Sequence, residues 1–362
     1  MSTPARRTPI DWATAARTAA TLAPAGPRLS VRQARQETDR LRAAAEASVG
    51  HVHRLTGLDA ARDLTDSQLL IVDRPTWAQA NTQAFEALLG PTFAHLEATW
   101  PQEFAAATTP VSSHAAGAET GAVLSWLSAK VLGQYEPFGS SSGSGGRLML
   151  VAPNVVQVRQ ELNVDAADFR MWVCLHEQTH RVQFAAAPWL AGHLQQRITE
   201  FSTAMFDKSD TMMERLRGAL RSLAPGESRG ASDGPGGLLG ILQDDEDRAR
   251  LNHLTAVMSL LEGHANVIMD AVDADVVSSV KTIRRRFADR SRRRSALDQW
   301  IGRLLGMDAK LRQYKDGQKL VDAAVAELGM EGFNVVWQDP ALLPTLEELH
   351  NPPAWVRRLR AA

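Results

Sequence analysis

Two histidines with a glutamate between them occur within five residues, at His176, Glu177 and His180. On an α-helix, residues four apart lie on the same face about one turn apart, so both imidazoles can reach the same ion. The glutamate is then placed to hold a water molecule near that ion. This H-E-x-x-H spacing indicates half of a zinc hydrolase site, which needs one more protein ligand. The alternative interpretation is a pair of core histidines satisfied by hydrogen bonds.

The residues around the motif predict the helix that this spacing requires. Asp165 is a candidate N-cap, Asp168 adds an acid to the first turn, and Pro188 ends the segment. Trp172 and Phe184 extend the row of the two histidines at four-residue spacing. The histidines therefore face a mostly apolar layer, where two imidazoles and a carboxylate are costly to bury without a purpose.

A second helix, expected to begin near Asp244, carries the candidates for the third ligand. Glu262 and His264 are two positions apart, hence about 200° apart around a helix axis, so they cannot both face one ion. Glu262 would complete a His-His-Glu set, and Asn266 on the same face can hydrogen-bond a liganding imidazole. His264 is the rival third ligand, or a donor to the substrate if the helix is distorted at Gly263.

Motifs spread over most of the chain resemble one known family. In chain order they lie at 73–77 with 80–81, 150–154, 176–184 with 188–190, 262–265, 306–314 and 343–348. The family consists of actinobacterial zincin-like proteins regarded as zinc-dependent metalloproteases, one branch of which is described as coenzyme F420 biosynthesis-associated. The resemblance implies a mainly α, zincin-like fold with a small β element near the metal site. No F420-binding motif is visible, and Asn266 stands where better-known zincins of the glutamate type have an aspartate.

The resemblance also implies zinc-dependent peptidase or amide hydrolase chemistry on a peptide or protein substrate. Carried over to this chain, His176, His180 and Glu262 are the Zn²⁺ ligands, and Glu177 is the base that moves a proton from water to the leaving amine. The developing oxyanion needs a further donor, for which His264 and Tyr314 are candidates. The alternative function is a non-catalytic protein of zincin fold in which a structural metal supports a binding or scaffold role.

Composition and charge argue against nucleic-acid and membrane partners. The 362 residues are 44% hydrophobic and carry a formal net charge of −1, which fits a globular enzyme. A single cysteine, Cys174, excludes an internal disulfide, and neither a targeting segment nor a run of about 18 apolar residues is present, so a cytoplasmic location is expected. The basic run at 281–294 is interpreted as a solvated helix face paired with carboxylates, with phosphate or acidic-partner binding as the alternative.

Helical patterns predict one main domain over residues 30–362, preceded by a packed helical segment over 1–29. Further helices are expected from Val31 after the N-cap Ser30, from Trp77 to Leu89 with Gly90 and Pro91 closing it, and at about 117–135. The best strand candidate is 148–151, either an edge strand that holds an extended peptide or a short core strand. Flexible loops are expected near 139–146 and 224–237, the second either a lid or a disordered segment.

Overall fold

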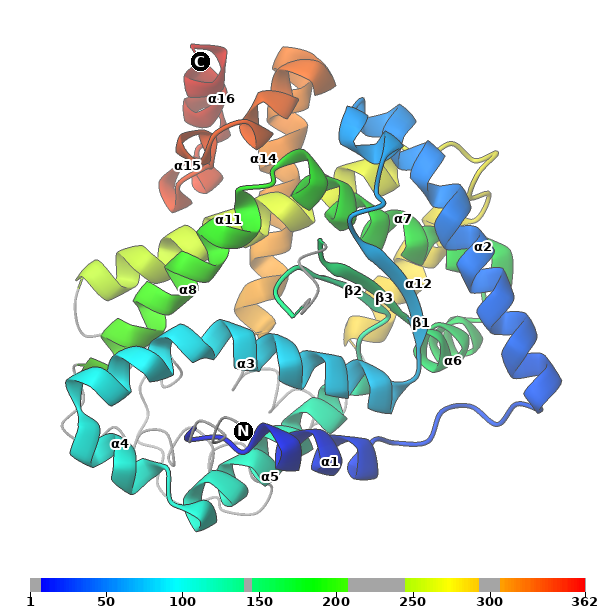
Figure 1. Cartoon of the computed structure of the whole chain (residues 1–362). Coiled ribbons are helices and arrows are strands. Elements are labelled where there is room, and N and C mark those ends of the chain that lie inside the picture. The colour runs from blue at the N-terminus through cyan, green and yellow to red at the C-terminus, as the bar shows by residue number, and fades with distance from the viewer. Residues whose placement is uncertain (1–7, 140–144, 208–244, 293–306, 362) are drawn as a thin grey trace.

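The fold is mainly α-helical with one small sheet, in agreement with the fold class predicted from the sequence (Figure 1). The structure, a computed structural model, describes residues 8–139, 145–207, 245–292 and 307–361, without the side chains of 207, 291–292 and 307–315. Its helices are α1 (Trp12–Leu22), α2 (Val31–Thr56), α3 (Arg74–Thr99), α4 (Pro101–Ala107), α5 (Pro110–Ser128), α6 (Ala152–Leu162), α7 (Ala166–Ala186), α8 (Leu190–Asp207), α11 (Asp245–Asp270), α12 (Val280–Arg292), α14 (Met307–Phe333), α15 (Leu346–His350) and α16 (Pro352–Arg360). Short 3-10 helices lie at η1 (Asp59–Arg62), η2 (Asn334–Trp337) and η3 (Pro340–Leu342).

Helix α7 carries the H-E-x-x-H motif and begins where the sequence predicts. Asp165 Oδ1 accepts hydrogen bonds from the backbone N–H groups of Ala167 and Asp168, at 2.8 and 2.9 Å. These bonds satisfy two of the N–H groups that a helix start leaves without partners. The helix ends at Ala186, two residues before Pro188. The prediction of a capped helix around the motif is therefore confirmed.

One predicted helix end is wrong, because α3 continues from Leu89 through Pro91 to Thr99. A proline inside a helix removes one backbone hydrogen bond and crowds the preceding turn. Beyond it, however, Phe93 and Leu96 are buried in an apolar cluster with residues of α1 and α4. Burial of these two side chains offsets the local cost of the proline, so tertiary packing overrides the local stop signal.

The sheet contains β1 (Gln68–Val72), β2 (Gly133–Glu136) and β3 (Arg147–Val151) in the order β1-β3-β2. β3 pairs in parallel with β1 and antiparallel with β2. The strand predicted at 148–151 is therefore central, which confirms the core-strand interpretation and contradicts the edge-strand one. The edge strands are β1 and β2. β2 lies in a region expected to be the end of a helix, but α5 stops at Ser128. β2 packs against α7 and thereby reaches the H-E-x-x-H motif.

Helices α7 and α11 are held together in the largest apolar core. α7 packs against α2, α11 and β2, and α11 also packs against α8 and α14. The core between them includes Phe169, Leu175, Leu260 and Phe333, all nearly inaccessible to solvent. The two helices that carry the candidate ligands, α7 and α11, therefore have little freedom to separate. In Figure 1, α15 and α16 lie at the top of the view and α1, α4 and α5 at the bottom.

The N-terminal helix α1 packs against α3 and α5. The connector from α1 to α2 is fastened by Arg74, whose guanidinium donates to the carbonyls of Pro24 and Ala25 at 2.9 and 2.8 Å and to Asn154 at 2.7 Å. The division into a segment over 1–29 and a domain over 30–362 remains a prediction.

The basic run at 281–294 is described as far as residue 292 and belongs to α12. Arg290 pairs with Glu161 at 2.8 Å, Arg284 pairs with Asp270, and Arg286 donates to the carbonyl of Leu162. These three arginines therefore meet carboxylates and carbonyls, as the solvated-face interpretation predicts. The loop predicted at 224–237 lies outside the described residues, and the loop at 139–146 is described only in part. Of the helices in the described ranges, none combines the length and apolar character needed to cross a membrane.

Candidate metal centre

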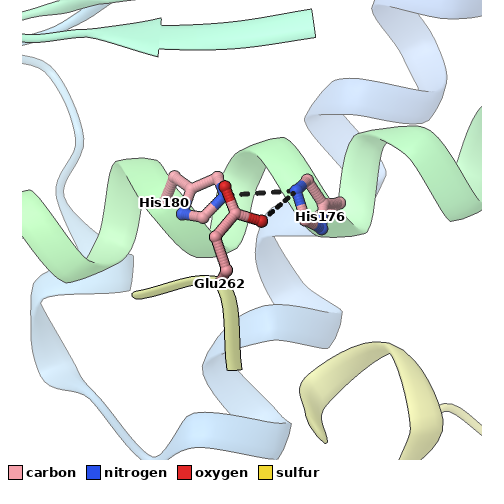
Figure 2. A group of neighbouring side chains, drawn as sticks. All are labelled: His176, His180 and Glu262. Carbon is pink, nitrogen blue, oxygen red and sulfur yellow. Dashed lines mark hydrogen bonds and ion pairs between the residues drawn. The ribbon is translucent and has the colours of Figure 1, made fainter. Parts of the chain in front are cut away.

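Half-buried side chains from α7 and α11 converge on one point (Figure 2). His176 and His180 project from α7, and the carboxylate of Glu262 on α11 is directed at both rings. The two Nε2 atoms are 3.2 Å apart, and the carboxylate oxygens lie 3.6 Å from Nε2 of His176 and 3.8 Å from Nε2 of His180. All the candidate ligand atoms lie within 4.8 Å of one another. Two imidazole nitrogens and one carboxylate oxygen are a donor set of catalytic zinc sites, so these residues fit a zinc ion.

The surroundings keep the first imidazole neutral. Burial, followed by the nearby His180, lowers the pKa of His176 to about 4, against the opposing effect of the Glu262 carboxylate. A neutral imidazole at ordinary pH retains a lone pair for a metal, whereas a protonated ring has none. The electrostatics of the site therefore favour the form of histidine that can bind a cation.

Glu177 is almost fully buried beside the cluster, with 6% of its surface exposed. Gly133, the first residue of β2, faces its carboxyl group: a Cβ atom at position 133 would lie 2.6 Å from Cγ and 2.9 Å from Oε1 of Glu177. Burial raises the pKa of Glu177 well above its ordinary value, and the negative charge of Glu262 adds to the rise. A carboxylate with a raised pKa is a better proton acceptor near neutral pH. The missing side chain at 133 makes room for this group, a role that sequence reasoning did not identify.

The structure does not bring His264 into the cluster. Its side chain has no exposed surface, and its ring packs against those of Phe333 at 5.0 Å and Trp337 at 5.4 Å between centroids. The two-residue offset from Glu262 places the two side chains on different faces of α11, and the carboxylate takes the face toward His176 and His180. The expectation that His264 is a third ligand or a donor to the substrate does not fit this placement.

The residue expected to orient a liganding imidazole was Asn266, and that expectation is wrong. His180 Nδ1 forms its hydrogen bond with Gln183 Oε1 at 2.9 Å, and His176 Nδ1 lies 3.1 Å from the sulfur of Met269. Gln183 was missed, although it stands three residues after His180 and therefore on a neighbouring part of the same helix face. Its position was visible in the sequence, but its contacts required the partner helix.

The remaining candidate, Tyr314, cannot be placed relative to the cluster, and the single cysteine packs against another helix. Tyr314 falls in the part of α14 whose side chains are outside the described residues, so its role as an oxyanion donor remains a prediction. Cys174 is buried, and its thiol is 3.9 Å from the carbonyl oxygen of Leu41 on α2. Burial raises the pKa of this thiol, which keeps it protonated in the core.

Comparison with known proteins agrees with this arrangement. The sequence model of the zincin-like metallopeptidase family matches residues 10–356, a range that includes the whole cluster. A crystal structure of a protein from Chloroflexus aurantiacus, described as a candidate hydrolase with a novel fold, is similar over 98% of this chain and 99% of that one. The TM-score is 0.62 and the sequence identity 28%. No curated protein matches the chain in sequence.

Proposed function

Because this chain belongs to the zincin-like metallopeptidase family, we propose that it is a zinc-dependent peptidase or a related amide hydrolase. The observation that carries the proposal is the convergence of His176, His180 and Glu262 from two helices within 4.8 Å. The description of the Chloroflexus aurantiacus protein as a candidate hydrolase supports the same class of reaction. The substrate we propose is a peptide or protein, since amide hydrolysis is the chemistry that this donor set and a neighbouring glutamate serve.

In the proposed mechanism, His176, His180 and Glu262 hold the ion. Bound zinc supplies Lewis acidity, which polarises the scissile carbonyl and lowers the pKa of a water molecule toward neutrality. Glu177 accepts the proton of the attacking water on its carboxylate and then delivers it to the nitrogen of the leaving amine. The absence of a side chain at Gly133 leaves room for the Glu177 carboxyl group, since a Cβ atom at that position would lie 2.6 Å from Cγ of Glu177.

The finer assignments made from the sequence are part of the proposal. Membership of the actinobacterial, F420-associated branch rests on the separated motifs alone, and a cytoplasmic location is proposed from the single cysteine. A direct role for F420 in the reaction has no support from the described residues. Metal-dependent hydrolysis is therefore the function to test first.

The experiment combines metal analysis with a peptide-library digest of the purified, zinc-loaded chain. We expect one zinc ion per chain, and we expect Glu177→Gln to lower cleavage by about 10²- to 10⁴-fold while zinc stays bound, because a proton acceptor is lost without a ligand. The matched control is Glu103→Gln, on the exposed surface of α4, which should change neither quantity.

The same experiment separates the alternative function. Zinc bound at one ion per chain without cleavage by the unmodified protein, over a broad library, would favour a structural metal in a scaffold role. Absence of zinc binding, or equal cleavage by the protein and its Glu177→Gln variant, would contradict the hydrolase proposal itself.

A further inference from the structure

The side-chain amide of Gln183 is fully buried between α7 and α11 and makes three hydrogen bonds. Its Oε1 is 2.9 Å from Nδ1 of His180. Its Nε2 donates to the backbone carbonyl of Leu261 at 2.9 Å and lies 3.0 Å from Nδ1 of His264. An amide has one acceptor oxygen and two N–H donors, so both donors and the oxygen are used.

The contact with Leu261 determines which way the amide points. A backbone carbonyl can only accept a hydrogen bond, so the –NH₂ group of Gln183 must face it. The reversed amide would set two carbonyl oxygens against each other in a buried place, where neither could find a donor. The oxygen of Gln183 must therefore face His180.

This orientation sets the position of a proton on the imidazole. The oxygen of Gln183 can only accept, so Nδ1 of His180 must carry the hydrogen that lies between them. A neutral ring with its proton on Nδ1 has an unprotonated Nε2. That Nε2 atom is the one directed at His176 and Glu262, so its lone pair faces the place where the ion would bind.

The buried ring of His264 completes the arrangement. Since Gln183 Nε2 donates its second hydrogen to Nδ1 of His264, that nitrogen is unprotonated, and a neutral ring then carries its proton on Nε2. This Nε2 has no hydrogen-bond partner among the described residues and lies within the aromatic packing of Phe333 and Trp337. Packing against Phe333 and Trp337 does not explain a histidine at position 264, because its buried N–H without an acceptor is unfavourable and an apolar ring would avoid that cost. An acceptor for the second N–H of Gln183 accounts for a histidine at this position.

The other imidazole of the cluster has no comparable support. Nδ1 of His176 faces the thioether sulfur of Met269 at 3.1 Å, and a thioether is a weak acceptor. The two rings therefore differ in how firmly their proton positions are determined. The network around Gln183 acts on His180 alone.

We infer that Gln183 is a positioning residue that holds His180 as the Nδ1–H tautomer, with the Leu261 carbonyl and the His264 ring fixing the orientation of the Gln183 amide. His180 then meets a metal ion with its lone pair already in place, without ring rotation or proton transfer. The inference rests on the proposed function for the identity of the ion. The tautomer itself is a property of the metal-free chain.

The direct test is the protonation state of His180 in the unmodified, metal-free full-length chain. Long-range ¹H–¹⁵N correlation spectra of protein labelled on its histidine rings distinguish a protonated from an unprotonated nitrogen, and His180→Ala identifies the signal. We expect a protonated Nδ1 and an unprotonated Nε2 for His180. A proton found on Nε2 instead overturns the inference, and no variant has to fold for this result to count.

The second test measures zinc affinity in a pair of glutamine variants. Gln183→Met keeps the length of the side chain but removes both donors and the acceptor, and we expect zinc affinity about 10- to 100-fold lower. The matched control is Gln178→Met on the same helix: Gln178 is equally buried, but its Nε2 donates to the carbonyl of Ala45 at 2.8 Å, away from the cluster. That control should leave zinc affinity and the tautomer of His180 unchanged, even where it lowers the melting temperature.

A conservative variant separates positioning from simple packing. Gln183→Glu, as the protonated acid, retains an acceptor oxygen for Nδ1–H of His180 and an O–H that can donate to the Leu261 carbonyl, so it should recover much of the zinc affinity that Gln183→Met loses. Folded Gln183→Met protein that binds zinc as tightly as the unmodified chain would contradict the inference. Failure of the unmodified chain to bind zinc would instead contradict the proposed function, and the tautomer measurement would still decide the inference.

Discussion

Two pairs of histidines lie beside or on helix α11, and the two pairs differ in the residues that surround them. In the first, His176 and His180 of α7 lie 3.2 Å apart at Nε2, beside the carboxylate of Glu262. In the second, Nε2 of His193 on α8 is 2.8 Å from Nε2 of His253 on α11. The distance between the two Nε2 atoms is thus shorter in the second pair, yet only the first pair belongs to a group of three candidate ligands within the described ranges.

The second pair shows how two imidazoles can meet without a metal. At 2.8 Å, an N–H of one ring donates to the unprotonated nitrogen of the other, which satisfies both. The charged neighbours on α8, Arg197 and Glu200, already pair with each other at 3.0 Å. The positive charge of Arg197 also disfavours a metal cation between His193 and His253. Close histidines therefore do not define a metal centre; the anionic third donor and the neighbouring general base of the first pair do.

The strongest test of this contrast removes one ring from each pair. We expect His180→Ala to lower zinc affinity by more than about 100-fold, beyond the effect of losing an outer hydrogen-bond partner, because one of three protein ligands is gone. His253→Ala should retain one zinc ion per chain with unchanged affinity. Isothermal titration of the metal-free proteins measures both. Loss of zinc from His253→Ala but not from His180→Ala would place the metal at the wrong pair for the hydrolase proposal.

A smaller effect is expected from filling the space beside the general base. A methyl group at Gly133 meets Glu177 at less than contact distance, so Gly133→Ala should displace the carboxylate and lower peptide cleavage by about 100-fold, with zinc still bound. Gly90→Ala is the control, since a Cβ at that position would meet no atom within 4 Å apart from its chain neighbours and the local helix backbone. Full activity of the Gly133→Ala variant would show that Glu177 can move without consequence.

The smallest expected effect is on how the free energy of unfolding depends on pH, through the second pair, His193 and His253. Burial lowers the pKa of His193 and His253, with a further lowering from Arg197 and an opposing effect of Glu200. Because the unfolded chain then binds more protons below its histidine pKa of about 6.5, the pair stabilises the fold fully above that pH and loses its contribution as the pH falls.

Replacing one ring of this pair should therefore flatten the pH dependence. We expect the free energy of unfolding of His253→Gln, measured in urea across about pH 5 to 8, to fall less steeply with acid than that of the unmodified chain. His350→Gln, at the exposed end of α15, is the control and should keep the original slope. Identical slopes for both variants would mean that the second pair does not titrate differently in the folded and unfolded chains.

Local patterns predicted the parts of the site that one helix contains. Four-residue spacing put His176 and His180 on one face, and Asp165 marked the start of that helix, because helix geometry and capping depend on neighbouring residues. Angular spacing on a single helix also predicted that Glu262 and His264 could not both be ligands. Which of the two reaches the histidines depends on how α11 packs against α7, and it is the carboxylate of Glu262.

Contacts between distant segments could not be predicted in the same way. Strand β2 and the space that Gly133 leaves for Glu177 depend on pairing with β3 and packing on α7, which no short pattern encodes. The role of Gln183 depends on a carbonyl of another helix. The passage of α3 through Pro91 likewise reflects burial of its second half against other helices, a tertiary effect that outweighs a local breaker.

The acceptor that orients Gln183 belongs to the main chain at Leu261, immediately before Glu262. No amino-acid replacement at position 261 deletes that oxygen, so this link between helices tolerates changes of side chain that would abolish an ordinary polar contact. The link does depend on the position of α11 along α7. A shift of α11 by one residue would move the Glu262 carboxylate and the Leu261 carbonyl away from α7 together, so the metal centre is either assembled as a whole or lost as a whole.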